Sequence, residues 1–197
     1  MTTNGSVAFF DRQFREQLAQ GDFRLNPFEE SILPRLHGRV LDYGCGLGNL
    51  ALAAAQRGCR VTALDASTTA IAGLRKRAAG LPLEAIEADL RDYTLEGEYD
   101  AVVSIGLLAY FDCATARRVL ERLQESVLPG GTAAINTLIE GTTWLGALQN
   151  DACCLFGRDE LKRRFADWNL LHAELSDFPA PGDTIKSFAT IIARKPA

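Results

Sequence analysis

The run from Val40 to Leu50, VLDYGCGLGNL, constrains the fold of this chain more than any other segment. Its apolar part ends at Asp42, and glycines follow at Gly44, Gly46 and Gly48. Glycine accepts positive φ angles and lets a backbone approach a ligand closely. A helix that begins after such a turn presents unpaired N–H groups beside it. The run therefore predicts a strand, a tight turn and a helix N-terminus that bind a nucleotide-like cofactor.

Two cofactors are compatible with this turn. Gly46, Gly48 and Ala51 fit the G-x-G-x-x-A pattern of dinucleotide-binding proteins, with Asp65 about where an acidic ribose ligand follows. Asp42 argues against a dinucleotide, because its carboxylate would face the negative charges of a pyrophosphate. The ammonium and sulfonium groups of S-adenosylmethionine would be attracted to that carboxylate, directly or through water. The charge of Asp42 therefore favours S-adenosylmethionine over a dinucleotide.

Aspartates also follow the next two predicted strands. Residues 59–64 lead to Asp65, and residues 83–88 lead to Asp89. The carboxyl ends of parallel strands meet at one rim of a doubly wound sheet, where ligands bind. We expect Asp65 to accept hydrogen bonds from both ribose hydroxyls and Asp89 from the adenine amino group. The plainer alternatives are that Asp65 caps a helix beginning near Ser67 and that Asp89 is a turn residue.

Together these motifs resemble the class I S-adenosylmethionine-dependent methyltransferases over roughly residues 36 to 139. The first motif is DYGCGLG from Asp42, the second LDAS from Leu64, the third EADL from Glu87 and the fourth YDAVVSIG from Tyr99. LPGG from Leu128 resembles the turn before the family's fifth strand. The resemblance implies S-adenosylmethionine as the cofactor and S-adenosylhomocysteine as its product. The candidate cofactor-binding residues are Asp42, Gly44, Cys45, Gly46, Gly48, Asp65, Ala66, Ser67, Asp89, Leu90 and Ile105.

The C-terminal third carries a narrower resemblance. LFGRDELKRRF from Leu155 and IKSFATIIARK from Ile185 are similar to the tellurite-resistance methyltransferases. This likeness implies a small, soft acceptor, either a thiol or a chalcogen or metalloid oxyanion. Between the last two strands those relatives carry a His and an Arg suited to an anion, whereas this chain reads LSDFPAPGDT from Leu175. Basic residues that would supply the charge instead are Arg12, Arg15 and Arg158.

Candidates for the acceptor side come from two segments. Phe9, Phe10 and Arg12 belong to a predicted N-terminal helix that would fold over the cofactor as a lid. Tyr110 and Phe111 belong to the loop after the fourth strand, and core packing is an equal alternative for the aromatic residues. Methyl transfer from a sulfonium is an in-line displacement by an activated reagent, so alignment and exclusion of water matter most. The sequence therefore identifies no catalytic base.

Strands that alternate with helices predict an α/β fold of the doubly wound, Rossmann-like type. We expect a mostly parallel seven-stranded sheet with helices on both faces, a helix over residues 158–168, and an antiparallel edge hairpin formed by residues 169–176 and 184–193. The 197 residues, of which 47% are hydrophobic, suit a single domain. Within it, residues 1–36 would form an N-terminal helical cap or lid and residues 37–197 the core.

Composition and net charge limit the kinds of partner that we expect this chain to bind. A formal net charge of -4 disfavours a nucleic-acid surface. The N-terminal MTTNGS lacks the features of a signal peptide, and no apolar run approaches the length of a membrane span. We therefore expect a cytoplasmic protein that acts on a small molecule, without nucleic acid or membrane, as a monomer or homodimer.

Cysteine and histidine usage gives no metal site. The five cysteines have no C-x-x-C spacing, so reduced thiols are expected, and the adjacent Cys153 and Cys154 are interpreted as packing residues. His172 lies in an apolar, strand-like run and is interpreted as structural.

Two other functions remain open. A nicotinamide-dependent oxidoreductase would use the same glycine turn, although the chain has no Tyr-x-x-x-Lys pair. A non-catalytic, methyltransferase-like binding module is the second alternative, because the acceptor residues are unassigned.

Overall fold

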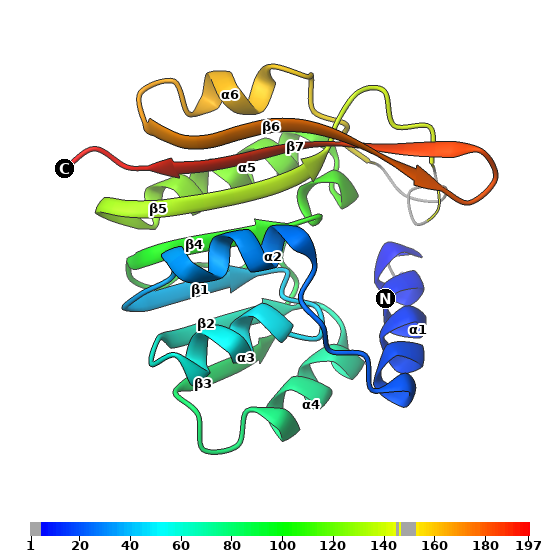
Figure 1. Cartoon of the computed structure of the whole chain (residues 1–197), viewed down its shortest axis with the longest axis vertical. Coiled ribbons are helices and arrows are strands. Elements are labelled where there is room, and N and C mark those ends of the chain that lie inside the picture. Colours follow the sequence, from blue (N-terminus) through cyan, green and yellow to red (C-terminus); the bar gives the residue numbers. More distant parts are fainter. Residues whose placement is uncertain (1–4, 145, 147–152) are drawn as a thin grey trace.

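The computed structural model describes residues 5–144, 146 and 153–197. Seven strands form one sheet in the order β3-β2-β1-β4-β5-β7-β6 (Figure 1). Strands β1 to β5 run parallel, whereas β7 is antiparallel to both β5 and β6. The strands are β1 (Arg39–Tyr43), β2 (Arg60–Asp65), β3 (Leu83–Glu87), β4 (Tyr99–Ile105), β5 (Val127–Leu138), β6 (Asn169–Ala180) and β7 (Thr184–Arg194). The predicted Rossmann-like sheet with an antiparallel edge hairpin is confirmed.

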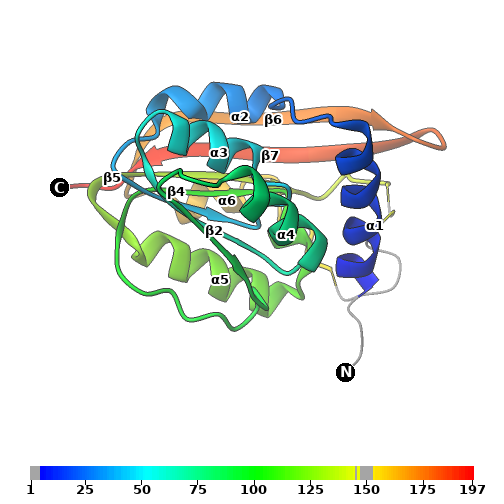
Figure 2. The ribbon, with the colours of Figure 1, turned by 90° about the horizontal axis from the view of Figure 1, so that it is seen from below.

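Helices cover both faces of this sheet (Figure 2). One face carries α2 (Pro27–Ile32), α3 (Asn49–Gln56) and α4 (Thr68–Arg77), and the other carries α5 (Cys113–Glu125) and α6 (Glu160–Arg164). The remaining elements are α1 (Gly5–Gln20) and two 3-10 helices, η1 (Leu33–Arg35) and η2 (Leu108–Tyr110).

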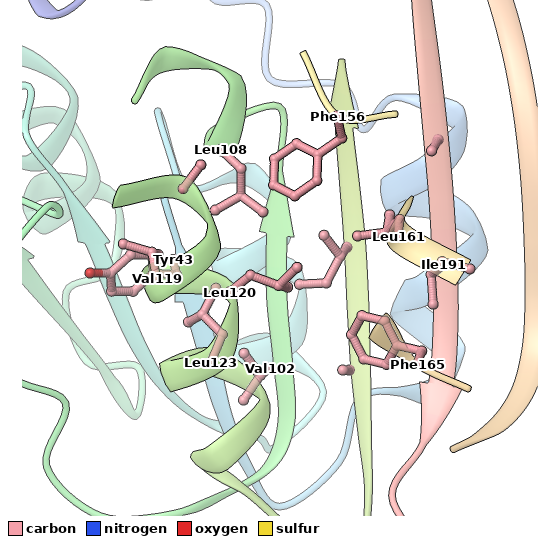
Figure 3. Close-up of a cluster of buried hydrophobic side chains, with 14 of the residues drawn as sticks. Tyr43, Val102, Leu108, Val119, Leu120, Leu123, Phe156, Leu161, Phe165 and Ile191 are labelled. Atoms are coloured by element: carbon pink, nitrogen blue, oxygen red, sulfur yellow. The ribbon is translucent and has the colours of Figure 1, made fainter. Parts of the chain in front are cut away.

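The alternation of side chains along β1 divides the core in two. Val40 packs with the residues under α3 and α4, whereas Leu41 and Tyr43 pack with those under α5 and α6. Figure 3 shows the second cluster, to which α5 contributes Leu120 and α6 contributes Leu161. Asp42 therefore shares the face of Val40, and its side chain is directed into the protein with 4% of its surface exposed.

Two elements differ clearly from expectation. The helix expected over residues 158–168 ends at Arg164, because the chain turns where Trp168 N donates to Phe165 O at 3.0 Å and the two rings meet edge to face. Strand β6 continues to Ala180, since it pairs with β7 as far as Thr184. The hairpin is therefore longer than its sequence pattern indicates.

Helix α1 lies across the carboxyl ends of the parallel strands (Figure 1). Asp11 joins it to the N-terminus of α4, where its carboxylate accepts hydrogen bonds from Ser67 Oγ at 2.6 Å and Thr69 N at 3.2 Å. Ser67 Oγ also caps α4 by accepting from Ala70 N at 3.1 Å. The N-terminus of a helix favours a negative charge, so Asp11 holds α1 against the core at this point.

A disulfide joins Cys113, at the start of α5, to Cys154. The expectation of reduced thiols is therefore wrong for these two residues. No sequence pattern indicates this pairing, because the two cysteines are 41 residues apart and only the fold brings them together. Cys154 is fully buried and Cys153 is exposed, so the packing role expected for both fits only Cys154.

Removal of this disulfide is expected to destabilise the protein. A closed loop of this length restricts the unfolded chain, and Cys154→Ser should lower the free energy of unfolding by about 2 to 4 kcal/mol in urea titrations. Cys153→Ser, which changes the adjacent free thiol, is the matched control and should leave stability unchanged. Equal stability of the two variants, or more than three reactive thiols in the denatured, unreduced wild type, would contradict the pairing.

Asp11→Ala should loosen α1. The loss of its hydrogen bonds to Ser67 and Thr69 removes about 1 kcal/mol of local stability, so amide exchange in Gly5–Gln20 should accelerate several-fold in mass-spectrometric measurements. Glu16→Ala, an exposed change on the same helix, should leave the exchange as in wild type. Identical exchange in both variants would show that Asp11 does not hold the helix.

Candidate functional site

The turn after β1 is held by the end of β2. Gly44 N and Cys45 N both donate to Leu64 O, at 2.8 and 2.9 Å. Gly46 N donates to Asp65 Oδ2 at 2.8 Å, and Ser67 N donates to Asp65 Oδ1 at 2.8 Å. The Asp65 carboxylate thus joins the glycine turn to the segment before α4. A carboxylate has about four acceptor positions, so it retains capacity for a ligand.

Gly48 packs closely against a side chain of α4. It occupies the N-cap of α3 with φ at 69°, and a Cβ there would lie 2.5 Å from Leu74 Cδ2. Glycine also brings no side chain to cap the helix, so the first N–H groups of α3 lack a side-chain acceptor. Gly48 and Asn49 both line a cavity, which gives those N–H groups a place to bind an anionic ligand group.

A cavity of about 750 Å³ lies at the carboxyl ends of β1, β2 and β4. All the residues expected from the sequence to bind the cofactor line this cavity: Asp42, Gly44, Cys45, Gly46, Gly48, Asp65, Ala66, Ser67, Asp89, Leu90 and Ile105. Helix α1 forms another wall through Phe10 and Phe14. The topology therefore brings residues from four separate motifs into one site.

Three carboxyl groups interact at one end of the cavity. Burial, together with the nearby charges of Glu29 and Asp65, raises the pKa of Asp42 to about 8. Burial also raises the pKa values of Glu29 and Asp65. The backbone N–H groups that donate hydrogen bonds to Asp65 partly oppose the rise in its pKa. Among the described residues, no cationic side chain pairs with Asp42. This end of the cavity is suited to a positively charged ligand.

Glu29 was missed by the sequence interpretation. It stands at the third position of α2 in a capping box, in which Asn26 N donates to its Oε2 at 2.7 Å and Glu29 N donates to Asn26 Oδ1 at 3.0 Å. The pattern N-P-F-E marks this helix start in the sequence. The position of the helix relative to Asp42 is set only by the fold.

Asp89 differs from the other two strand-end aspartates. Strand β3 ends at Glu87, so Asp89 lies two residues beyond it. Its carboxylate is paired with Arg91, whose Nε donates at 2.9 Å, and this hydrogen bond lowers the pKa of Asp89. The backbone of Leu90, the next residue, is held in place because the Tyr43 hydroxyl donates to Leu90 O at 2.6 Å. The predicted contact of Asp89 with adenine stays a prediction.

The acceptor-side candidates divide into two groups. Phe10, Tyr110 and Phe111 line the cavity, and the rings of Phe10 and Tyr110 meet edge to face with centres 4.9 Å apart. Phe9 and Arg12 are not part of the lining, and the Arg12 guanidinium lies 5.6 Å from the centre of the Phe9 ring. Arg15 and Arg158 are also outside the lining, and Arg15 pairs with Asp11.

The structure instead brings Lys186 of β7 to the cavity wall. The sequence interpretation missed it, because it follows the hairpin turn and sits in a strand pattern. The signal in the sequence that could have identified Lys186 is its position close to the turn between the last two strands.

Other kinds of site lack support in the described part of the chain. No group of three or more His, Cys, Asp or Glu side chains there is arranged to hold a metal ion. None of the helices formed by those residues is long and apolar enough to cross a membrane.

Comparisons with known proteins agree with this geometry. A family model described as a methyltransferase domain matches residues 40–131. The cypemycin N-terminal methyltransferase of a Streptomyces species is 35% identical over 105 residues, which cover 51% of this chain and 42% of that protein. The chain spans about half the length of the first curated relatives that it matches.

Solved structures share the whole fold. TehB from Haemophilus influenzae superposes with a TM-score of 0.78 at 20% identity, covering 91% of this chain and 65% of that one. The N-methyltransferase NodS from Bradyrhizobium japonicum in complex with S-adenosylhomocysteine gives a TM-score of 0.69 at 15% identity, covering 95% and 99%. The match over residues 40–131, with the four sequence motifs gathered around one cavity, identifies a methyltransferase domain of the class I S-adenosylmethionine-dependent type.

Proposed function

We propose that this protein transfers a methyl group from S-adenosylmethionine to a small, soft acceptor, either a thiol or a chalcogen or metalloid oxyanion. The observation that carries the proposal is the buried Asp42, which has no cationic partner among the described residues and lies beside Glu29 and Asp65 in the wall of the cavity. Burial of a carboxylate without a counter-charge is unfavourable, so a cationic ligand would stabilise this site. S-adenosylmethionine carries such charge on its ammonium and sulfonium groups.

The same charges argue against a dinucleotide. A pyrophosphate at the glycine turn would bring negative charge towards Asp42 and Asp65, whose pKa values are already raised by their surroundings. The structure adds no observation that favours nicotinamide chemistry. We therefore keep methyl transfer as the proposed reaction.

Each side chain has a defined part in the proposal. Asp65 would accept from the ribose hydroxyls, with its orientation fixed by the N–H groups of Gly46 and Ser67. Asp42 and Glu29 would offset the positive charge of the methionine end, and the N-terminus of α3 would face its carboxylate. When bound, the cofactor supplies an electrophilic methyl carbon: a lone pair of the acceptor forms the new bond, and the electrons of the broken C–S bond stay on sulfur.

In this proposal, α1 and η2 exclude water from the site. Phe10 and Phe14 of α1 and Tyr110 of η2 line the cavity, and Asp11 holds α1 in place. We propose that α1 acts as a lid over the reacting groups. Alignment and dehydration are what a reaction with an already activated donor requires of its protein.

Cofactor binding tests the proposal directly. Isothermal titration should show S-adenosylhomocysteine binding to the wild type, and S-adenosylmethionine should be turned over with a member of a panel of thiols and chalcogen oxyanions. Absence of binding would overturn the proposal. Binding without turnover across the panel would favour the non-catalytic binding module.

Asp65→Ala should weaken this binding. The loss of a charged acceptor is expected to reduce the affinity for S-adenosylhomocysteine by about 1 to 3 kcal/mol in the same titration. Asp92→Ala is the matched control, because Asp92 is an exposed acid that pairs with Arg118 and lies outside the cavity lining. Wild-type affinity in Asp65→Ala would show that the ribose assignment is wrong.

The raised pKa of Asp42 predicts how stability depends on pH. Between the ordinary pKa near 3.8 and the folded value of about 8, the folded state binds more protons than the unfolded state. The ligand-free protein should therefore lose stability as pH rises from about 4 to 8, by about 1.4 kcal/mol for each pH unit at most. Asp42→Asn should make this fall shallower in urea titrations, while it weakens S-adenosylhomocysteine binding at pH 8.

Asp92→Asn should keep the wild-type slope, since Asp92 is exposed. If Asp42→Asn and wild type lose stability equally over this pH range, Asp42 is not the buried acid that the cavity geometry indicates.

A further inference from the structure

In the described part of the chain, three basic side chains line the cavity, and two of them are paired with carboxylates. Arg24 pairs with Asp22 at 2.9 Å, and Arg91 Nε donates to Asp89 at 2.9 Å. Lys186 has no carboxylate partner among the described residues. The cavity wall therefore contains an ammonium group without a counter-charge.

The position of this ammonium is fixed by its neighbours. Lys186 Nζ lies 3.9 Å from the centre of the Trp144 ring. Thr143 N and Trp144 N both donate to Ile185 O, at 2.9 and 3.1 Å, which holds the indole beside β7. The face of a tryptophan attracts a cation. It does not neutralise one, so Lys186 is oriented but not paired.

Two aromatic residues flank Lys186 in the hairpin, because Phe178 is its partner on β6 and Phe188 follows two residues later on β7. Tyr110, Leu138 and Phe188 line the same cavity, and they pack together around Ala109. Partial burial lowers the pKa of Lys186, because the ammonium has lost part of its hydration. A partly desolvated cation gains more from an anionic partner than an exposed one does. The carboxyl groups of Asp42 and Glu29, by contrast, are suited to a cation.

We propose that Lys186 is the acceptor-binding residue and that the methyl acceptor is a small anion. This inference rests on the proposed methyltransferase function, and it names the acceptor's charge. An inorganic oxyanion and an organic acid that carries a thiol share the required chemistry, since each combines a negative charge with a soft nucleophilic atom. The cavity would then hold a cationic donor and an anionic acceptor, each beside a protein charge of opposite sign.

Trp144 provides a direct measure of anion binding. The chain has two tryptophans, and Trp168, which packs on Phe165, can be replaced by Phe to leave Trp144 as the reporter. In this background, selenite and 3-mercaptopropionate are titrated into protein saturated with S-adenosylhomocysteine, and the neutral 3-mercaptopropionamide is titrated in parallel. At least one of the two anions should change the Trp144 emission at a concentration at least tenfold lower than the amide, and comparison of the two arms separates inorganic from organic acceptors.

Three variants test the role of Lys186. Lys186→Met should weaken anion binding at least tenfold, whereas Lys186→Arg should retain it within about threefold. Lys162→Met removes an exposed lysine of α6 and should behave as the parent protein. Calorimetric affinity for S-adenosylhomocysteine should be the same in all three, which also shows that they fold.

The proposal is overturned if neither anion binds more tightly than the amide, or if Lys186→Met binds anions as the parent does. The titration is repeated without S-adenosylhomocysteine. Failure of the parent to bind S-adenosylhomocysteine would count against the cofactor, whereas the response to anions in the ligand-free protein still decides the role of Lys186.

Discussion

Asp42 holds a carboxylate inside the protein, at the point where the sheet reverses its strand order, with no cation beside it among the described residues. Its orientation follows from the alternation of β1, because Leu41 and Tyr43 fill the opposite core. The strand cannot shift by one residue to expose Asp42 without moving Tyr43 out of that core. The packing of the whole sheet therefore maintains an unpaired acid at the rim, and the glycine turn, α2 and α1 are arranged around it.

Local patterns in the sequence were sufficient to predict much of this arrangement. Apolar runs that end near Asp42 and Asp65 identify strands, and glycines at Gly44 and Gly48 identify a turn that only glycine adopts, so the rim follows from the rule that parallel strands end on one side. The residues expected to bind the cofactor line one cavity for the same reason. They lie within a few residues of a strand end, and their position does not depend on distant packing.

Features that depend on distant contacts were not predictable in this way. The pairing of Cys113 with Cys154 and the approach of Glu29 to Asp42 require the positions of elements that are far apart in the sequence. Lys186 was overlooked for a related reason, since the turn between β6 and β7 has no basic residue and the missing charge was sought in Arg12, Arg15 and Arg158. The pairing of β6 with β7 continues to Thr184, and this extension determines where Lys186 lies.

The fold keeps the acidic and basic groups of the cavity wall apart. Asp42 and Lys186 do not pair with each other, and each bears a desolvation cost in the ligand-free protein, as their displaced pKa values show. A direct ion pair would remove that cost but would also remove the charge difference along the cavity. Because the acids lie on β1, β2 and α2 whereas the lysine lies on β7, the sheet itself prevents this collapse. Under the proposed function, a cationic donor and an anionic acceptor would each offset the desolvation cost of the group that they bind.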